Sequence, residues 1–246
     1  MSDASPDSAT STGRIGAPDI PRNVAVIMDG NGRWARERGQ PVAAGHREGT
    51  RALRRTVEAA LELGVESLAV YAFSTENWTR PVDEVEALME IFGETIEREL
   101  PDLARQGVRT RFIGRRDRAP EELRARMEAL EAETSGNTRL QLWIAFDYGG
   151  RAELVEAARR LVAAGLEPGE VDEQAVASRL YAPEMPDPDL VIRTSGEYRI
   201  SNFLLWQLAY AELVFVDRHW PDFEERDLRA ALAAYGRRGR RFGGRQ

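Results

Sequence analysis

The chain has no cysteine and no lysine among its 246 residues, and only two histidines, His46 and His219. Without cysteine there is no disulfide framework, thiol nucleophile, iron–sulfur cluster or thiolate zinc site. Without lysine there is no Schiff base, no Walker-type phosphate-binding lysine and no kinase lysine. The chemistry must therefore come from carboxylates, arginines, amides, hydroxyls and at most two imidazoles, with a hard cation as the expected helper.

An excess of positive charge and a long apolar run are also missing. The chain carries 41 acidic residues against 34 arginines, a formal charge of −7, which argues against a nucleic-acid partner. Its N-terminal segment has neither the basic start nor the apolar run of a secretory signal. The most apolar stretch, residues 200–216, is interrupted by Asn202, Gln207 and Glu212, and is too polar to span a bilayer. We therefore expect a cytoplasmic protein without a membrane span.

Residues 1–19 are rich in Ser, Asp, Ala, Thr and Pro, so we expect a disordered N-terminal tail before a single catalytic domain at residues 20–246. In that domain short apolar runs alternate with segments of helical period. The runs predict strands at residues 24–28, 68–73, 108–113, 140–146, 190–192 and 213–216. This pattern predicts an α/β fold with about six mainly parallel strands, flanked by helices on both faces. Such sheets bind ligands beyond the carboxyl ends of their strands, which is where the polar motifs fall.

The first predicted strand is followed by the sequence Asp29-Gly30-Asn31-Gly32-Arg33-Trp34. The two glycines would let backbone N–H groups approach an anion, and Arg33 could contact a phosphate through two N–H groups. Asp29 is placed to hold Mg²⁺ beside that phosphate. A plain tight turn would also use these glycines, but the added Asp and Arg favour phosphate binding.

The same segment offers a competing interpretation, because Gly30, Gly32 and Ala35 fit a dinucleotide-binding pattern. That pattern requires an acidic residue at the tip of the second strand. The nearest acids, Glu48 and Glu58, lie on or beside a predicted helix instead. NAD binding is therefore disfavoured.

Polar loops follow the second and fifth predicted strands, at residues 74–81 and 193–201. In the first loop, Ser74 and Thr75 could be turn residues and Trp78 a cap over the core. The second loop has two arginines, two serines and a glycine, and is a plausible second anion site. Two anion sites at strand tips suggest two phosphorylated substrates or one long one.

Three further features have two interpretations each. His46 precedes a predicted helix near the first anion loop, so it is either a structural histidine or a phosphate contact. Glu212 is either a solvated side chain or part of a cation site. The C-terminal arginines at 237–245 are either a solvated tail or reach a ligand across a dimer interface. We interpret His219 as structural.

Taken together, these motifs resemble the cis-prenyltransferases, the family of bacterial undecaprenyl diphosphate synthase. The likeness runs from about Pro21 to Gly244, and several blocks in one order make it specific. The blocks are MDGNGRWA (28–35), AGH with Gly49 (44–49), YAFSTENWTRP (71–81), DLVIRTSGEYRISNFLLWQLAYAEL (189–213), WPDF (220–223) and RRFGG (240–244).

The resemblance implies a homodimer that condenses isopentenyl diphosphate with an allylic diphosphate of the farnesyl or geranyl type, using Mg²⁺. The product would be a Z-polyprenyl diphosphate of the undecaprenyl type, passed on to the membrane. It implies Asp29 and Asn77 as catalytic residues and Asp29 and Glu212 as metal ligands, the latter near the dimer interface. It implies contacts with the allylic diphosphate from Gly30, Asn31, Gly32, Arg33 and His46, and with isopentenyl diphosphate from Arg193, Arg199 and Ser201. Trp34 and Ile200 are implied as substrate-binding residues as well. Ser74, Thr75, Glu76, Trp78 and Arg80 would line the reacting centre, and Arg241 would complete the partner's site.

The growing hydrocarbon chain needs an apolar tunnel, and the predicted helix with Val85, Leu88, Met89 and Phe92 is either its wall or plain core. Two positions depart from the family pattern: Val42 stands where arginine is frequent, and Tyr198 where many bacterial members have histidine. Neither the product length nor the preferred primer follows from the sequence.

Two rival classes are disfavoured. The all-helical trans-prenyl synthases use Asp-rich DDxxD pairs, and the chain has no Asp-Asp dipeptide. A non-catalytic subunit would be expected to lack the Asp29 loop or the C-terminal motif, and both are present.

Overall fold

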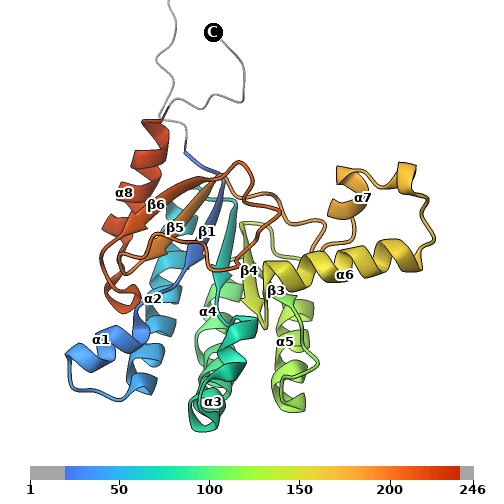
Figure 1. Cartoon of the computed structure of the whole chain (residues 1–246). Helices are drawn as coiled ribbons and strands as arrows, with labels where there is room; N and C mark the ends of the chain where they lie inside the picture. Colours follow the sequence, from blue (N-terminus) through green and yellow to red (C-terminus); the bar gives the residue numbers. More distant parts are fainter. Residues whose placement is uncertain (1–19, 239–246) are drawn as a thin grey trace, which may run out of the picture.

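The computed structural model describes residues 20–238, so the predicted N-terminal tail and residues 239–246 lie outside the described residues. The strands are β1 (Asn23–Ile27), β2 (Ser67–Tyr71), β3 (Val108–Gly114), β4 (Leu140–Phe146), β5 (Leu190–Thr194) and β6 (Glu212–Val216). They form a 6-stranded sheet in the order β3-β4-β2-β1-β5-β6, and every neighbouring pair is parallel (Figure 1). The predicted α/β fold is confirmed, and each predicted strand overlaps an observed one.

The helices are α1 (Asn31–Glu37), α2 (Val42–Glu62), α3 (Val82–Arg98), α4 (Leu100–Arg105), α5 (Glu121–Glu133), α6 (Gly150–Ala163), α7 (Glu173–Ala177) and α8 (Glu225–Gly236). Short 3₁₀ helices occur at Thr75–Thr79 (η1), Pro168–Glu170 (η2) and Trp220–Asp222 (η3). Across residues 20–238, none of the helices combines the length and the apolar character that crossing a membrane requires.

The two faces of the sheet are covered in different ways. Side chains from α2, α3, α4, α5 and α8 pack on one face and form the larger core. The smaller core on the other face is closed mainly by irregular chain around residues 181–185 and 200–211. Helices α6 and α7 extend beside the sheet (Figure 1).

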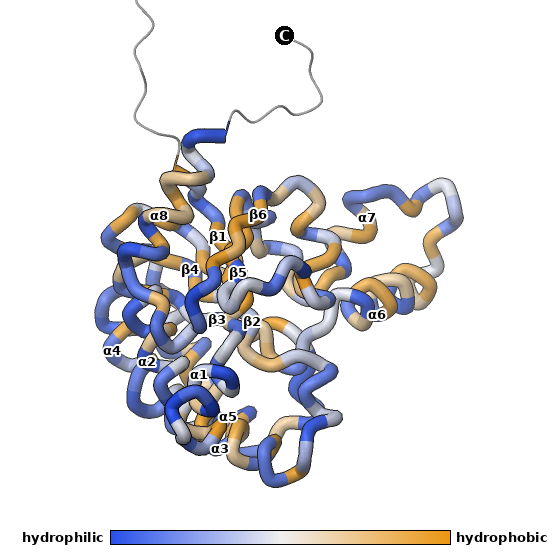
Figure 2. Tube along the Cα trace, turned by 60° about the vertical axis from the view of Figure 1, so that its left-hand side comes forward, coloured by the Kyte–Doolittle hydropathy of each residue, from blue (hydrophilic) through white to orange (hydrophobic). Residues whose placement is uncertain are grey.

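The strands are apolar on both sides because both faces are buried. In β1, Val24 and Val26 belong to the larger core, whereas Ala25 and Ile27 belong to the smaller one, as the period of two in a strand requires. In Figure 2, β1, β5 and β6 are therefore mostly orange, while α6 alternates between orange and blue.

The position of β1 explains where a ligand can bind. The chain leaves β1 towards β2 on one side of the sheet, and returns on the other side as β5. Where the strand order reverses in this way, a crevice opens at the carboxyl ends of the two neighbouring strands. In this sheet the crevice lies at the ends of β1 and β5, next to Asp29 and Arg193.

Candidate active site

A pocket of about 490 Å³, called the polar pocket below, opens at the carboxyl ends of β1, β2 and β5. It is lined by loops after these strands and by the nearest turns of α1, α2 and α3. The structure brings to it these predicted site residues: Asp29, Gly30, Asn31, Gly32, Arg33, His46, Ser74, Asn77, Arg80, Arg193 and Ser201. Residues far apart in the sequence thus meet at one place, as the strand-end argument predicts.

Asp29 is held at the centre of the polar pocket by two guanidinium groups. Its Oδ2 accepts a hydrogen bond from Arg193 Nη2 at 2.8 Å, and its Oδ1 lies 3.1 Å from Arg33 Nη2. Its backbone is fixed as well, because Asp29 N donates to Thr194 Oγ1 at 2.9 Å and Asp29 O accepts from Trp220 N at 3.0 Å. The carboxylate therefore points into the pocket in one defined orientation.

The charge of Asp29 follows from the same contacts. Burial is the largest influence and raises its pKa, but the hydrogen bonds and positive charges of Arg193 and Arg33 together outweigh it. The net pKa of Asp29 therefore lies below its ordinary value. The carboxylate is ionised at neutral pH and can accept a cation.

Gly30 is required by the backbone at the start of α1. It has a φ of 108°, in the left-handed region that glycine tolerates. A β-carbon at this position would lie 2.3 Å from Ser195 Oγ, so no other residue fits without displacing the β5 loop. The residues at the start of α1 line the polar pocket, and the free N–H groups of a helix start stabilise an anion.

Asn77 lies on η1, and within residues 20–238 only the oxygen of its side-chain amide has a hydrogen-bond partner. Its Oδ1 accepts a hydrogen bond from Ser74 N at 2.9 Å. The NH₂ group is therefore the end that remains for a ligand, and it can only donate. This geometry favours contact with a phosphate oxygen or a water, and it excludes Asn77 as a base.

His46 lies in the first part of α2 and lines the polar pocket. Burial, followed by the positive charge of Arg80, lowers its pKa to about 4, although Glu84 acts in the opposite direction. At neutral pH the ring is uncharged. It can therefore offer an N–H donor to an anion, but not a full positive charge.

Some predicted binding residues instead support the walls of the site. Trp34 Nε1 donates to Asp222 Oδ1 at 2.8 Å, and Trp78 Nε1 donates to Asp147 Oδ1 at 2.8 Å. Both oxygens of Glu76 are engaged, one by Asn202 Nδ2 and one by Thr75 Oγ1. These side chains do not line the polar pocket, and their contact with substrate stays a prediction.

The remaining predicted residues also lie away from the pocket lining. Arg199 is 59% exposed and pairs with Glu197, whereas Ile200 packs against the smaller core. Glu212 begins β6 next to Leu190, at the opposite end of β5 from Arg193, and it pairs with Arg238. Within one chain Glu212 therefore does not share a metal site with Asp29. Arg241 lies outside the described residues.

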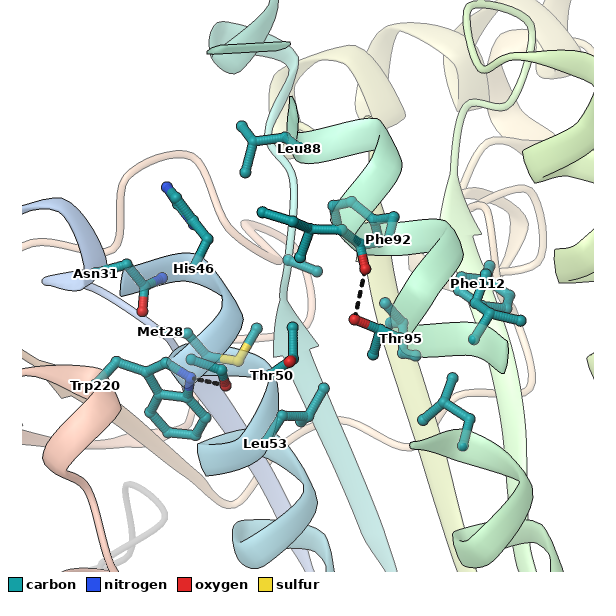
Figure 3. A pocket seen from close by; sticks show the side chains of 16 residues that line it. Met28, Asn31, His46, Thr50, Leu53, Leu88, Phe92, Thr95, Phe112 and Trp220 are labelled. Atoms are coloured by element: carbon teal, nitrogen blue, oxygen red, sulfur yellow. Dashed lines mark hydrogen bonds between the residues drawn. The ribbon is translucent and has the colours of Figure 1, made fainter. Parts of the chain in front are cut away.

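A second, apolar cavity of about 70 Å³ lies between α2 and α3, above the sheet (Figure 3). Its hydroxyl and indole groups bond to the backbone: Thr95 Oγ1 donates to Ile91 O at 2.7 Å, and Trp220 Nε1 to Gly49 O at 2.8 Å. The wall thus presents mainly carbon to the interior. Of the predicted tunnel residues, Leu88 and Phe92 line this apolar cavity, whereas Val85 and Met89 are packed in the core.

The two spaces are neighbours with shared walls. The residues common to both linings are Met28, Asn31, His46, Ala72 and Leu88. Asn31 Oδ1 lies at this boundary, buried and without a hydrogen-bond partner among residues 20–238. The polar pocket therefore adjoins the apolar cavity directly.

The predicted site residues did not include several polar or charged side chains at the pocket. Arg36, Glu84 and Tyr71 line the polar pocket, and Glu197 accepts from Arg33 Nη1 at 2.8 Å. Arg36 follows Arg33 by three positions, and Glu84 follows Arg80 by four. Helical spacing was the signal that could have found these two.

The site fits Mg²⁺ in the way that this ion commonly binds. Residues 20–238 contain no group of three or more His, Asp or Glu side chains that would form an all-protein cage. Mg²⁺ usually takes one or two carboxylates together with waters and substrate phosphate oxygens. Asp29 is an ionised oxygen ligand beside guanidiniums that would hold such a phosphate, so its surroundings suit the ion.

Fold and site together define an α/β enzyme for a ligand with an anionic head and a hydrocarbon tail. Residues 27–243 match the family model described as putative undecaprenyl diphosphate synthase. The chain belongs to this family, and it is a prenyltransferase that lengthens prenyl diphosphates with cis double bonds.

Known proteins of this family are similar to the chain over nearly its whole length. The chain is 52% identical over 229 residues to a ditrans,polycis-undecaprenyl-diphosphate synthase, (2E,6E)-farnesyl-diphosphate specific, of Xanthomonas oryzae pv. oryzae, covering 92% of this chain and 89% of that protein. It is 48% identical to an isoprenyl transferase of Thermotoga maritima, covering 92% and 97%. The structure resembles lavandulyl diphosphate synthase from Lavandula x intermedia in complex with dimethylallyl diphosphate, with a TM-score of 0.89, 37% identity and coverage of 92% and 99%.

Proposed function

We propose that the enzyme condenses isopentenyl diphosphate with an allylic diphosphate, of the farnesyl type, to give a Z-polyprenyl diphosphate in a Mg²⁺-dependent reaction. The observation that carries this proposal is the shared wall between the polar pocket and the apolar cavity. A prenyl diphosphate has the same two parts, a multiply charged head and a hydrocarbon tail. The relative from Xanthomonas oryzae, which is named as farnesyl-diphosphate specific, supports the choice of primer.

The allylic diphosphate would bind at the start of α1. Backbone N–H groups of Gly30, Asn31 and Gly32 and the guanidinium of Arg33 supply donors, and the neutral ring of His46 adds one more. The tail would then point towards the apolar cavity, past Leu88.

Isopentenyl diphosphate would bind on the β5 side of the polar pocket. Arg193 Nη1 donates to Ser201 Oγ at 2.7 Å and also to Arg199 O, which fixes its guanidinium between Asp29 and the β5 loop. Arg193 Nε is buried and has no hydrogen-bond partner among residues 20–238. Arg199, on the same loop, would have to turn from Glu197 to reach a phosphate.

The reaction needs charge stabilisation rather than a strong base. The C–O bond of the allylic substrate breaks, and the diphosphate leaves with the electron pair. The double bond of isopentenyl diphosphate attacks the allylic carbon, and a proton then leaves the new cation. Arginines and N–H donors lower the barrier by stabilising the negative charge that grows on the leaving group, and each such donor contributes about 2.7–4 kcal/mol. The NH₂ group of Asn77 would orient a diphosphate oxygen.

Asp29 would hold Mg²⁺, together with phosphate oxygens and water. When bound, the ion neutralises charge on the leaving diphosphate. The cytoplasmic location that the sequence suggests stays a prediction.

The reaction and the role of Asp29 can be tested together. The full chain is incubated with radiolabelled isopentenyl diphosphate and dimethylallyl, geranyl or farnesyl diphosphate, and the products are separated by chain length. We expect Z-polyprenyl products, with the farnesyl primer used best, and loss of turnover with EDTA. Asp29→Ala should unfold at nearly the normal temperature but lose roughly 10²–10³-fold in turnover.

Asp117→Ala serves as the matched control, since this carboxylate is exposed and outside the polar pocket, and it should keep its activity. Full activity of Asp29→Ala, together with no effect of EDTA, would disprove the metal role. No product with any primer would disprove the proposed reaction.

We also propose that the enzyme acts as a homodimer, with β6 at the interface. β6 is an edge strand, which leaves backbone groups free to meet another chain. Leu213 on this strand is 37% exposed, and Tyr210, two residues before the strand, is 80% exposed. The Arg238–Glu212 ion pair joins the last described residue to β6. The RRFGG motif itself lies outside the described residues, and its part in the partner's site is what the family resemblance implies.

Mixing two inactive variants tests this arrangement. One variant carries Asp29→Ala, and the other lacks Arg240 onward. Each should be a dimer in sedimentation, and each should have little activity alone. If the tail of one copy completes the site of the other, mixed dimers contain one intact site and activity returns. Monomers in sedimentation, or no recovery after mixing, would contradict the proposal.

A further inference from the structure

Arg36 occupies a position in the polar pocket that the proposed mechanism does not use. It lies on α1, one turn after Arg33, at the exposed mouth of the pocket. A β-carbon placed on Gly32 would lie 3.6 Å from Arg36 Nη1 and 3.8 Å from Val42 Cγ1. The guanidinium therefore lies beside the backbone of the glycine loop, with Val42 next to the same point.

The arginines that line the polar pocket differ in whether they pair with a carboxylate. Arg33 pairs with Asp29 and Glu197, Arg193 pairs with Asp29, and Arg80 pairs with Glu84. Among residues 20–238, Arg36 is the one guanidinium of the pocket lining without a carboxylate within 4.0 Å.

This difference matters for anion binding. A guanidinium that already pairs with a carboxylate must share or exchange that partner when a phosphate arrives. Arg36 has no such competition within the described chain, and its planar fork of N–H donors suits phosphate oxygens. Because it lies at the mouth of the pocket, it would face the outer end of a diphosphate bound beside Asp29.

We propose that Arg36 binds the diphosphate of the allylic substrate and sets the enzyme's affinity for it, an inference that rests on the proposed function. Val42 supplies no charge at the adjacent position on α2, so α1 provides the cation instead. Arg36 is thus a binding residue for one substrate, because isopentenyl diphosphate is assigned to the β5 side of the pocket.

The test compares Arg36→Gln with the wild-type chain in steady-state kinetics for each substrate. Losing one charge-assisted contact should raise KM for the allylic diphosphate roughly tenfold, while KM for isopentenyl diphosphate stays within about twofold. The difference in allylic KM between Arg36→Gln and the wild-type chain should shrink at high salt, since the charge of an exposed side chain is screened. Arg51→Gln is the matched control, as Arg51 is an exposed arginine on α2 outside the pocket.

A double variant makes the assignment sharper. Arg36→Gln combined with Val42→Arg returns a guanidinium to the same point from α2, and should restore most of the allylic affinity. An unchanged allylic KM in Arg36→Gln, an equal rise in both KM values, or no recovery in the double variant would overturn the proposal.

Calorimetry with inorganic pyrophosphate provides a readout that does not need turnover. Arg36→Gln should bind pyrophosphate more weakly than wild type and Arg51→Gln. If the wild-type enzyme makes no prenyl product, the proposed function fails, whatever Arg36 does. If it is active and Arg36→Gln behaves like wild type in kinetics and binding, only the present inference fails.

Discussion

The polar pocket and the apolar cavity are adjacent, yet they are built according to different rules. In the polar pocket most charged side chains are held by a particular partner, as Asp29 is by Arg33 and Arg193. In the apolar cavity Ile91, Ile96 and Phe112 supply only shape and carbon surface. A cationic side chain stabilises a phosphate only when its donors have the correct geometry. A hydrocarbon chain binds wherever there is enough space and few unpaired polar groups.

This contrast separates two properties of the enzyme. Reactivity should depend on residues of the polar pocket, and a single loss there should affect turnover more than folding. Product length and stability should depend on the cavity walls. Arg193 and Ile96 allow a direct comparison, because they are 4% and 6% exposed and each lines only one of the two spaces.

Arg193→Gln should have the largest effect on turnover. The substitution removes the buried cation that contacts Asp29 and that the proposed mechanism assigns to isopentenyl diphosphate. Because Asp29 and the second substrate would both lose this contact, we expect turnover to fall roughly 10²–10³-fold. Arg111→Gln, which removes an ion-paired arginine of β3 outside the polar pocket, is the control. Turnover is measured with saturating substrates, and folding by thermal denaturation. If both variants lost the same small factor, the polar pocket would not be the reacting centre.

Ile96→Ala should show the opposite pattern. Removing this side chain from α3 should lower the free energy of unfolding by about 2–5 kcal/mol and enlarge the apolar cavity. The native fraction should carry out the first condensation at nearly the normal rate, but release longer products. Leu103→Ala, which empties a fully buried site of α4 outside the cavity, should cost similar stability without changing product length. Equal product lengths in the two variants would show that the cavity does not hold the chain.

The fold was predictable because its signals are local. Strands buried on both faces give short apolar runs, and the helices on the larger core show helical periodicity. The cover of the smaller core was not predictable in the same way. Its chain around residues 200–211 has no period, and Ser201, Asn202 and Leu204 adopt left-handed backbone conformations that only tertiary contacts hold.

The part of the site that could be predicted is the set of residues that directly follow the strands. The position of Asp29, Asn77 and Arg193 follows from the strand ends alone. The direction of a side chain does not, because it depends on partners far away in the sequence. The indole of Trp34 turns to Asp222, 188 residues later, and that of Trp78 turns to Asp147. Sequence motifs therefore predicted which loops meet at the polar pocket, but not which of their side chains line it.

His46 lines both spaces, and its titration tests how closely they are connected. Its pKa is about 4 in the folded chain, against 6.5 as the ordinary value. The unfolded chain therefore binds more protons between these values, and wild-type stability should fall as the pH drops from about 6.5 to 4. The contribution of one such group to this slope is at most about 1.4 kcal/mol per pH unit.

His46→Gln keeps a polar side chain but removes the titration, so its stability should depend less on pH in this window. Urea unfolding at several pH values measures the difference between the two proteins. Pyrophosphate bound in the polar pocket would favour the charged ring of His46 and raise its pKa. With the ligand, the wild-type stability should therefore depend less on pH, as it does in the variant. Parallel curves for the two proteins, with and without pyrophosphate, would show that His46 is not buried against the anion site.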